Sequence, residues 1–330
     1  MASFTMLFMS AVVSAATVYI FAGLGELISE RAGVLNLGVE GMMLVGALSG
    51  YVTTATTGNY WLGFLVGSFS GAILSLLHAF LCISLNADQA ISGIMITLLG
   101  AGATSYFGRP WSATSIDGFP TTTLPVVGTY LAELPYVGII LFQNSATDFI
   151  ALALIPVVWA FLYKTNAGLE LLSVGEDPET ADTMGVQVFR MRYLAVLIGG
   201  LFAGAAGAHL SLSFNTLWSS GMTAGTGWIA VALVIFAQWR PGRVVAGAYL
   251  FAIFSALQLR SQSLSLSVPA DIPFSGILNG ALGFFLDPSI MSTYPYVVTI
   301  LVLVIVVRRT ENSHLAQPSA LVQSYKRELD

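Results

Sequence analysis

Nine long apolar runs constrain the fold of this chain more than any other feature; they lie at roughly residues 5–28, 34–54, 61–85, 90–107, 148–163, 193–213, 226–239, 244–258 and 294–307. A helix needs about 20 mostly apolar residues to cross a bilayer. Only 9% of the chain is charged, against about 25% in ordinary soluble domains, so it cannot cover a water-facing surface. The sequence predicts an all-α integral membrane protein with about nine transmembrane helices in one domain, residues 1–330. Such a chain contacts membrane lipid, and nothing in it indicates nucleic-acid binding.

A shorter apolar piece at 274–286 is bracketed by Pro273 and Pro288. It falls at the low end of the length that spans a bilayer. Short segments are tolerated at membrane depth where protein surrounds them. We therefore expect this piece to be re-entrant.

The positive charges sort by side when the nine runs are threaded with the N-terminus outside. Arg109 and Arg260 fall on one side, and ten others fall opposite: Arg31, Lys164, Arg190, Arg192, Arg240, Arg243, Arg308, Arg309, Lys326 and Arg327. Cytoplasmic loops carry the excess of Lys and Arg. This predicts a cytoplasmic loop at 164–192, a cytoplasmic tail at 308–330 and an external stretch at 108–147. A full crossing at 274–286 would put the tail outside, which again favours re-entrance.

The first run differs from a cleaved signal peptide. No Lys or Arg precedes it, it contains Glu26, and Glu30-Arg31 follows it, which reverses the charge order of a signal. The single cysteine, Cys82, lies in an apolar run and excludes an internal disulfide.

Sequence patterns for catalysis are absent. The chain has no G-x-x-x-x-G-K-[ST], H-E-x-x-H, C-x-x-C or G-x-S-x-G segment. Of its histidines, His314 lies in the tail, whereas His78 and His209 lie in apolar runs and are expected to hydrogen-bond to neighbouring helices. The sequence therefore predicts neither a catalytic nor a metal site.

Glycines recur at four-residue spacing, which places small residues on one helical face where two backbones can approach closely. These sets are Gly46/Gly50, Gly63/Gly67/Gly71, Gly200/Gly204, Gly221/Gly225 and Gly276/Gly280.

Two polar side chains stand out where the second run enters the membrane. Asn36 and Glu40 are four residues apart, which predicts that they share a helical face. A carboxylate at the centre of a membrane helix costs about 2.5–3.5 kcal/mol, so Glu40 needs a partner or water. Glu40 is either a pathway residue or a clamp that holds its helix to another.

The predicted cytoplasmic loop contains a short helix at about 177–184. Asp177 suits the N-cap, Pro178 the first helical position, and Gly185 the stop. A helix of about two turns is unstable alone, so it needs a docking partner.

Six segments resemble those of permease subunits of ABC importers. G-x-x-P-E-T-A-x-x-x-G-V resembles their coupling helix, which involves the residues Gly175, Glu176, Asp177, Pro178, Glu179, Thr180, Ala181 and Asp182. E-R-x-G-V-x-N-L-G-x-E-G-M-M-x-x-G-A resembles the opening of the branch that serves simple sugars, branched-chain amino acids and nucleosides. The segments beginning at Ala87, Leu201 and Gly227, and the tail motif from Pro318 to Tyr325, are also similar to this branch.

The resemblance, which is closest to nucleoside permeases, implies a type II-like importer fold in a bacterial plasma (inner) membrane. It implies a second permease subunit, usually in a heterodimer, a cytoplasmic ATPase and an extracytoplasmic binding protein. ATP and Mg²⁺ would bind the ATPase, so this chain would carry no cofactor and would not be an enzyme. The expected solute is a nucleoside, with a ribose-like sugar as the alternative. A secondary transporter or channel, an intramembrane scaffold and a receptor are the other classes. The chain departs from the family pattern between Ser261 and Thr293, where the extra apolar piece lies.

Aromatic and amide side chains are predicted near the outer end of a passage. Phe214, Asn215 and Trp218 follow the helix that leaves the loop, and Thr226 and Trp228 open the next one. Such flat surfaces suit a sugar or base ring. The sequence predicts that Asn36 and Glu40 line or brace the passage and that these five residues lie near its outer gate. Alternatively, the aromatics form an interfacial belt.

Overall fold

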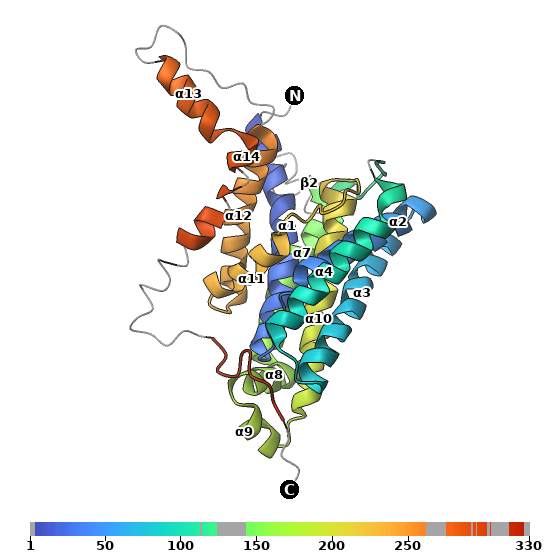
Figure 1. Ribbon diagram of the computed structural model, residues 1–330, viewed down its shortest axis with the longest axis vertical. Coiled ribbons are helices and arrows are strands. Elements are labelled where there is room, and N and C mark those ends of the chain that lie inside the picture. The colour runs from blue at the N-terminus through green and yellow to red at the C-terminus, as the bar shows by residue number, and fades with distance from the viewer. Residues whose placement is uncertain are drawn as a thin grey trace.

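The computed structural model describes residues 4–112, 114–123, 143–261, 275–291, 293–294, 296–301, 304 and 317–326. Long helices lie side by side in a bundle (Figure 1). They are α1 (Phe4–Arg31), α2 (Val39–Thr57), α3 (Tyr60–Ala79), α4 (Gln89–Phe107), α7 (Ala146–Lys164), α10 (Val188–His209), α11 (Thr226–Phe236) and α12 (Pro241–Ser261). Five-residue π-helices, η1 (Phe80–Ser84) and η3 (Leu210–Phe214), extend α3 and α10.

Shorter elements lie at the two ends of the bundle. Helices α8 (Asn166–Glu176) and α9 (Pro178–Thr183) lie at the lower end in Figure 1, and α13 (Ser275–Phe285) and α14 (Pro288–Met291) toward the upper end. A 3₁₀ turn, η2 (Arg109–Trp111), follows α4. Strands β1 (Thr121–Thr123) and β2 (Gln143–Ser145) pair antiparallel, with Thr121 opposite Ser145. This small sheet was not predicted by the all-α interpretation.

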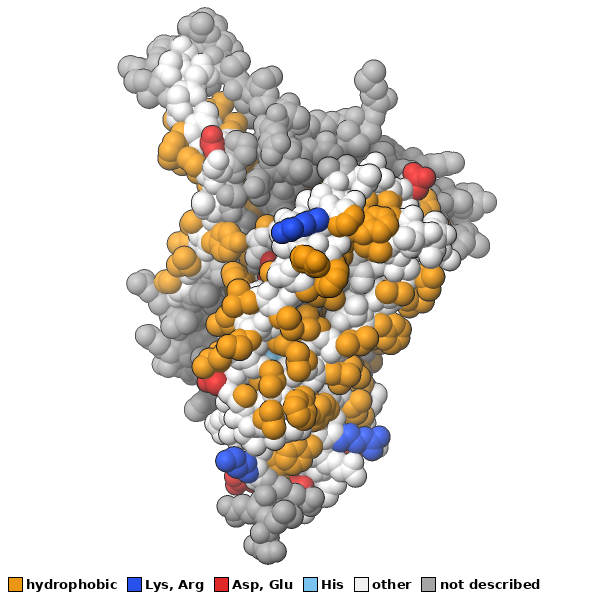
Figure 2. Space-filling view, turned by 45° about the vertical axis from the view of Figure 1, so that its right-hand side comes forward, with side chains coloured by type: hydrophobic (Ala, Val, Ile, Leu, Met, Phe, Trp, Pro, Cys, Tyr) orange, Lys and Arg blue, Asp and Glu red, His pale blue; other side chains and the backbone are white. Residues whose placement is uncertain are grey.

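Helices α1 and α10 form the centre of the bundle. Helix α1 packs against α7, α10, α11 and α12, and α10 also packs against α2 and α3. Accordingly most of α1 is buried, whereas α3 and α4 each leave one apolar face exposed. Figure 2 shows these exposed hydrophobic side chains as a broad band, with Lys and Arg side chains toward the two ends. An apolar band of this kind is what lipid tails cover.

Five helical stretches of the described residues are long and apolar enough to cross a membrane: Phe8–Arg31, Tyr60–Ser84, Gln89–Phe107, Ala146–Lys164 and Val188–Phe214. The chain is therefore a multi-pass membrane protein. Helix α2 is not among these five stretches, and most of its residues are buried against other helices. The predicted total of about nine crossings is not established by these helices.

Two predicted spans differ from the observed helices. The run at 34–54 becomes helical only at Val39, and the run at 226–239 forms the eleven-residue helix α11. The piece at 274–286 contains α13, also eleven residues, which at 1.5 Å per residue reaches only about half of the 30 Å hydrocarbon core. That it re-enters the membrane stays a prediction. The run at 294–307 lies partly outside the described residues.

The predicted charge sorting agrees with the positions of the helix ends. Arg31 ends α1, Lys164 ends α7, and Arg190 lies at the start of α10, all at the end of the bundle beside α8. We call this end the basic end. Arg109 follows α4 at the opposite end. Which end faces the cytoplasm stays a prediction.

Close helix contacts at glycine were predicted for five sets of glycines, and the structure shows them for three of these sets. A Cβ added at Gly204 of α10 would lie less than 3.0 Å from the backbone of α3, and one at Gly46 of α2 would clash with Gly204 in the same way. The remaining two sets differ. Gly221 and Gly225 have positive φ in the loop before α11, and a Cβ added at Gly276 or Gly280 would meet nothing within 4 Å.

Replacing Gly204 with valine is expected to force α10 away from α2 and α3. Overpacking a filled interior typically costs about 1–3 kcal/mol, so the midpoint of thermal unfolding in detergent should fall clearly. Gly102→Val on α4 is the matched control, because a Cβ there meets nothing within 4 Å. Equal unfolding midpoints for the two variants would contradict this close-packing account.

Candidate functional site

Helix α11 is a half-length helix that begins inside the bundle. Its eleven residues extend about 16 Å, roughly half of the hydrocarbon core. The turn that follows it is held at the basic end, where Trp239 Nε1 donates to Glu30 Oε2 at 2.5 Å and Arg31 Nη2 donates to Trp239 O at 3.0 Å. Its first turn therefore lies inside the bundle, about half a hydrocarbon-core thickness from the basic end.

The carboxylate of Glu40 caps the start of α11. Its Oε2 accepts the N–H of Gly227 at 2.7 Å, and its Oε1 accepts the N–H of Gly225 at 2.8 Å and the hydroxyl of Thr223 at 2.6 Å. Helix N-termini carry unpaired N–H groups and a partial positive charge that favours an anion. Glu40 is only 6% exposed. These contacts are those expected of the clamp that was one of the two predicted roles.

The sequence-based placement of Asn36 on the same helical face as Glu40 is wrong. Asn36 precedes α2, and its Oδ1 accepts the N–H of Gly38 at 3.0 Å. This local bond favours a turn over a helix. The chain from Gly33 to Gly38 thus enters the bundle without helical structure.

Side chains from three helices satisfy the backbone of this entering segment. Leu35 N–H donates to Gln89 Oε1 at 2.7 Å, and Leu35 O accepts from His78 Nε2 at 3.1 Å. Asn36 N–H donates to Glu26 Oε1 at 2.9 Å. Backbone groups inside a membrane must find protein partners because no water replaces them. His78 Nδ1 also lies 3.0 Å from Ser92 Oγ of α4, so its predicted bonding to a neighbouring helix is confirmed. The sequence did not indicate that Glu26 and Gln89 bond to the entering segment.

A cavity of about 230 Å³ lies between α1, η3, the loop before α11, and α12. Three of the predicted pathway residues line it: Phe214, Asn215 and Thr226. Tyr19 and Ser255 also line it, with their hydroxyl oxygens 2.9 Å apart. Among the described residues that line this cavity, none is charged. Its volume suits a small solute better than a drug-sized ligand, whose pockets usually exceed about 300 Å³.

The other predicted gate residues lie elsewhere. Trp218 is fully buried against Tyr51 and Leu44 of α2. Trp228 is 49% exposed, although it belongs to the first turn of α11. Neither tryptophan lines the cavity. Of the predicted gate residues, Phe214, Asn215 and Thr226 therefore line the cavity, whereas Trp218 and Trp228 do not.

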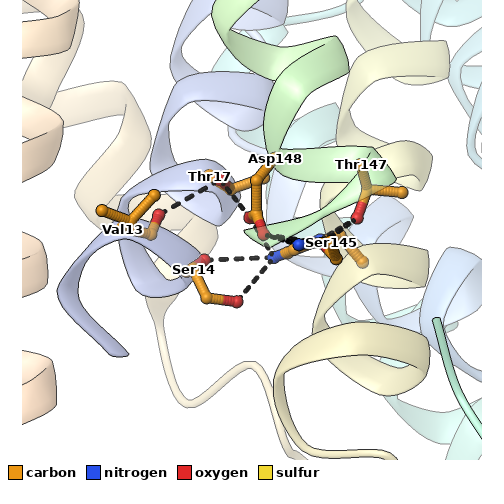
Figure 3. Close-up of polar contacts among 7 residues, drawn as sticks. Val13, Ser14, Thr17, Ser145, Thr147 and Asp148 are labelled. Atoms are coloured by element: carbon orange, nitrogen blue, oxygen red, sulfur yellow. Dashed lines mark hydrogen bonds and ion pairs between the residues drawn. The ribbon is translucent and has the colours of Figure 1, made fainter. Parts of the chain in front are cut away.

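A buried polar network lies between α1, the start of α7 and the end of α10. His209 Nδ1 lies 2.8 Å from Thr147 Oγ1, and its Nε2 lies 3.0 Å from Ser14 O. Asp148 accepts the hydroxyl of Thr17 at 2.7 Å and the hydroxyl of Ser145 at 2.6 Å. Figure 3 shows the labelled side chains of this network converging from α1 and the start of α7. The predicted bonding of His209 to a neighbouring helix is confirmed, and the network joins α1, α7 and α10.

At the basic end, α9 is capped as its sequence predicts. Asp177 accepts the backbone N–H of Thr180 at 3.0 Å and its hydroxyl at 2.6 Å. These hydrogen bonds lower the pKa of Asp177, so it stays ionised at neutral pH. Gly185, in the left-handed region at φ 89°, ends the turn. Local cap signals therefore located this helix almost to the residue.

The two faces of α9 differ in what they contact. Ala181 is buried with Val174, Val188 and Tyr325. Glu179 and Thr180 are exposed, and Met184 at the C-terminal end is 80% exposed. No role was expected for Met184 from the sequence. A long apolar side chain at the end of a predicted docking helix is the sequence signal that could have indicated this position.

The described residues contain no group of three or more His, Cys, Asp or Glu side chains placed to hold a metal ion.

Comparisons with known proteins identify the family. The family described as "Branched-chain amino acid transport system / permease component" matches residues 8–307. "Putative glucose ABC transporter permease protein TsgC13" of Haloferax volcanii is 63% identical, over 99% of this chain and 100% of that protein. "Guanosine ABC transporter permease protein NupQ" of Bacillus subtilis is 34% identical, over 89% and 91%. "Glucose ABC transporter permease protein TsgB13" of Haloferax volcanii is 26% identical, over 71% and 64%.

No solved structure matches the chain. The family match and the relative at 63% identity each cover nearly all of it, in agreement with its multi-pass helical architecture. The chain therefore belongs to the ABC transporter permeases of the branched-chain amino acid transport system / permease component family.

Proposed function

We propose that the chain is one of two permease subunits of an ATP-driven importer and that it carries a small, neutral, polar solute. The observation that carries this proposal is a capped, exposed helix at one end of a bundle whose interior holds an uncharged cavity. Hydrolysis would occur on a separate ATPase, since the chain has no phosphate-binding G-x-x-x-x-G-K-[ST] segment. An extracytoplasmic binding protein would deliver the solute.

The proposed arrangement includes about nine crossings in a type II-like fold, with the N-terminus outside and the C-terminus in the cytoplasm of a plasma membrane. Its basis is the sorting of Arg and Lys to the end that carries α8 and α9. An impermeant thiol reagent that modified Met184→Cys from outside intact cells would contradict this orientation.

A second permease subunit is supported by the relatives. TsgC13 and TsgB13 are both named as glucose permease proteins of one organism, and this chain is 63% identical to the first and 26% identical to the second. We therefore propose a heterodimer in which this chain takes the place that TsgC13 would occupy.

For the solute, we propose a monosaccharide such as glucose. The sequence patterns favoured a nucleoside, but the relative named for glucose has the higher identity, 63% against 34% for the one named for guanosine. The cavity offers the hydroxyls of Tyr19, Thr226 and Ser255 and the amide of Asn215, which suit a solute rich in hydroxyls. A nucleoside remains the second candidate because Phe214 and Tyr19 could stack on a base.

Solute choice is tested by uptake into proteoliposomes that contain both permeases and the ATPase, supplied with the binding protein. Labelled glucose should accumulate, and excess unlabelled guanosine should not compete. Replacing Asn215 with alanine should lower glucose uptake about tenfold, since an unmade hydrogen bond in a buried site costs about 1–3 kcal/mol. Competition by guanosine but not by unlabelled glucose would overturn the choice of sugar and leave the transport proposal intact.

A further inference from the structure

The C-terminal segment 317–326 lies against α8 and α9 at the basic end (Figure 1). Ala320 N–H donates to Gly175 O at 2.9 Å, and the hydroxyl of Ser319 donates to Glu176 Oε2 at 3.2 Å. Tyr325 Oη donates to Asp182 Oδ2 at 2.9 Å. The segment therefore contacts the last turn of α8 and the second half of α9.

The same segment completes a small apolar core beneath α9. Tyr325 is 7% exposed and packs with Val174, Ala181 and Val188. Its ring centre lies 5.6 Å from that of Phe189, at the start of α10. Because α9 has only six residues, its own hydrogen bonds cannot hold it. Tyr325 thus contributes the largest side chain on which this short helix rests.

The segment also joins α9 to the part of the chain that enters the bundle. Arg192 Nη1 of α10 donates to Gln323 O at 3.1 Å. A Cβ at Gly33 would lie 3.1 Å from Ala320 O, so the tail backbone packs closely on the turn between α1 and α2. That turn leads into the Gly33–Gly38 segment and on to Glu40. A continuous set of contacts therefore runs from α9 through the tail to the clamp on α11.

We infer that residues 318–325 form a positioning strap that holds α9 rigidly against α10 and the Gly33 turn, so that movement imposed on α9 reaches the translocation region. This inference rests on the proposed role of α9 in docking an ATPase. The strap itself does not touch solute or nucleotide. Its loss should leave ATP hydrolysis running while less solute moves for each ATP consumed.

The test measures solute transported per ATP hydrolysed in proteoliposomes that hold the complete transporter. Tyr325→Phe removes the donor to Asp182 and keeps the ring, and should lower this ratio about threefold, which lies within the net contribution of one partly exposed hydrogen bond. Tyr325→Ala also empties the core beneath α9 and should lower it about tenfold or more. Lys326→Ala, an exposed neighbour, is the matched control and should keep the parental ratio.

A cross-link separates the strap from a general effect on folding. Ser319→Cys and Glu176→Cys in a Cys82→Ser background, joined by a short bismaleimide, should transport at least as well as the same double-cysteine protein before linking. In the Tyr325→Ala variant the link should restore part of the lost ratio. A linked protein that hydrolyses ATP but no longer transports would show that the tail must detach, which overturns the strap.

The outcome for Met184 distinguishes the two proposals. If Met184→Asp weakens ATPase binding while Tyr325→Ala keeps the parental transport ratio, the strap is wrong and the docking role of α9 stands. If Met184→Asp changes neither ATPase binding nor transport, the docking role fails, and the strap fails with it.

Discussion

Replacing Glu40 with glutamine is expected to abolish most transport while the protein still inserts into the membrane. The two carboxylate oxygens accept three hydrogen bonds from Thr223, Gly225 and Gly227. Glutamine would turn its NH₂ group toward at least one of these donors. A buried donor left without an acceptor costs about 1–3 kcal/mol, and loss of the charge at a helix N-terminus adds up to about 2 kcal/mol. We expect at least a tenfold loss of transport.

The control for this change is Glu170→Gln on α8, which makes the same substitution at a partly exposed site and should transport at the parental rate. A defect confined to the amount of folded protein would show that Glu40 is purely a clamp. A changed preference among solutes would show that the clamp also shapes the pathway. Normal insertion and parental transport by Glu40→Gln would exclude both roles.

Replacing Met184 with aspartate is expected to detach the ATPase. Met184 is 80% exposed at the end of α9, and burying a methionine in a partner groove contributes about 1.5–3 kcal/mol. An aspartate would lose this contribution and bring a charge into the groove. ATPase binding in detergent should weaken about tenfold or more, with transport lost in parallel. Met184→Leu, which keeps an apolar side chain of similar volume, should bind the ATPase nearly as well.

Ala181 provides an informative contrast to Met184. It belongs to the segment that predicted coupling, yet it faces Tyr325 and Val174 inside the chain. A leucine there should therefore displace α9 and destabilise the loop, rather than block the ATPase from outside. Increased proteolysis between α8 and α10 in Ala181→Leu, absent from Met184→Asp, would distinguish the two effects. Equal protease resistance of both variants would contradict the buried position of Ala181.

The sequence predicted well those elements whose position depends on neighbouring residues alone. The membrane helices follow apolar run length, and α9 follows its own caps, Asp177 and Gly185. The late start of α2 has a local cause, the bond from Gly38 N–H to Asn36 Oδ1, together with the distant bond from Leu35 N–H to Gln89. The half-length of α11 could not be read locally, because its start depends on the distant contact of Gly227 with Glu40.

The sequence placed only some of the predicted gate residues at the cavity. Phe214, Asn215 and Thr226 lie together because η3 and the start of α11 meet at one cavity. Trp218 and Trp228 share the residue type expected of a gate, but one is fully buried and the other faces outward. Sequence periodicity does not distinguish these cases, since both lie in or beside a loop with positive φ at Gly221 and Gly225.

ATP-dependent uptake is the measurement that most directly tests the assignment as an importer permease. Proteoliposomes containing this chain, its partner permease and the ATPase should accumulate labelled glucose above the external concentration only when ATP is present on the α9 side and the binding protein on the opposite side. A non-hydrolysable ATP analogue should stop this accumulation. Uptake at the same rate by this chain alone, without ATPase or ATP, would show a secondary transporter or channel and would contradict the account.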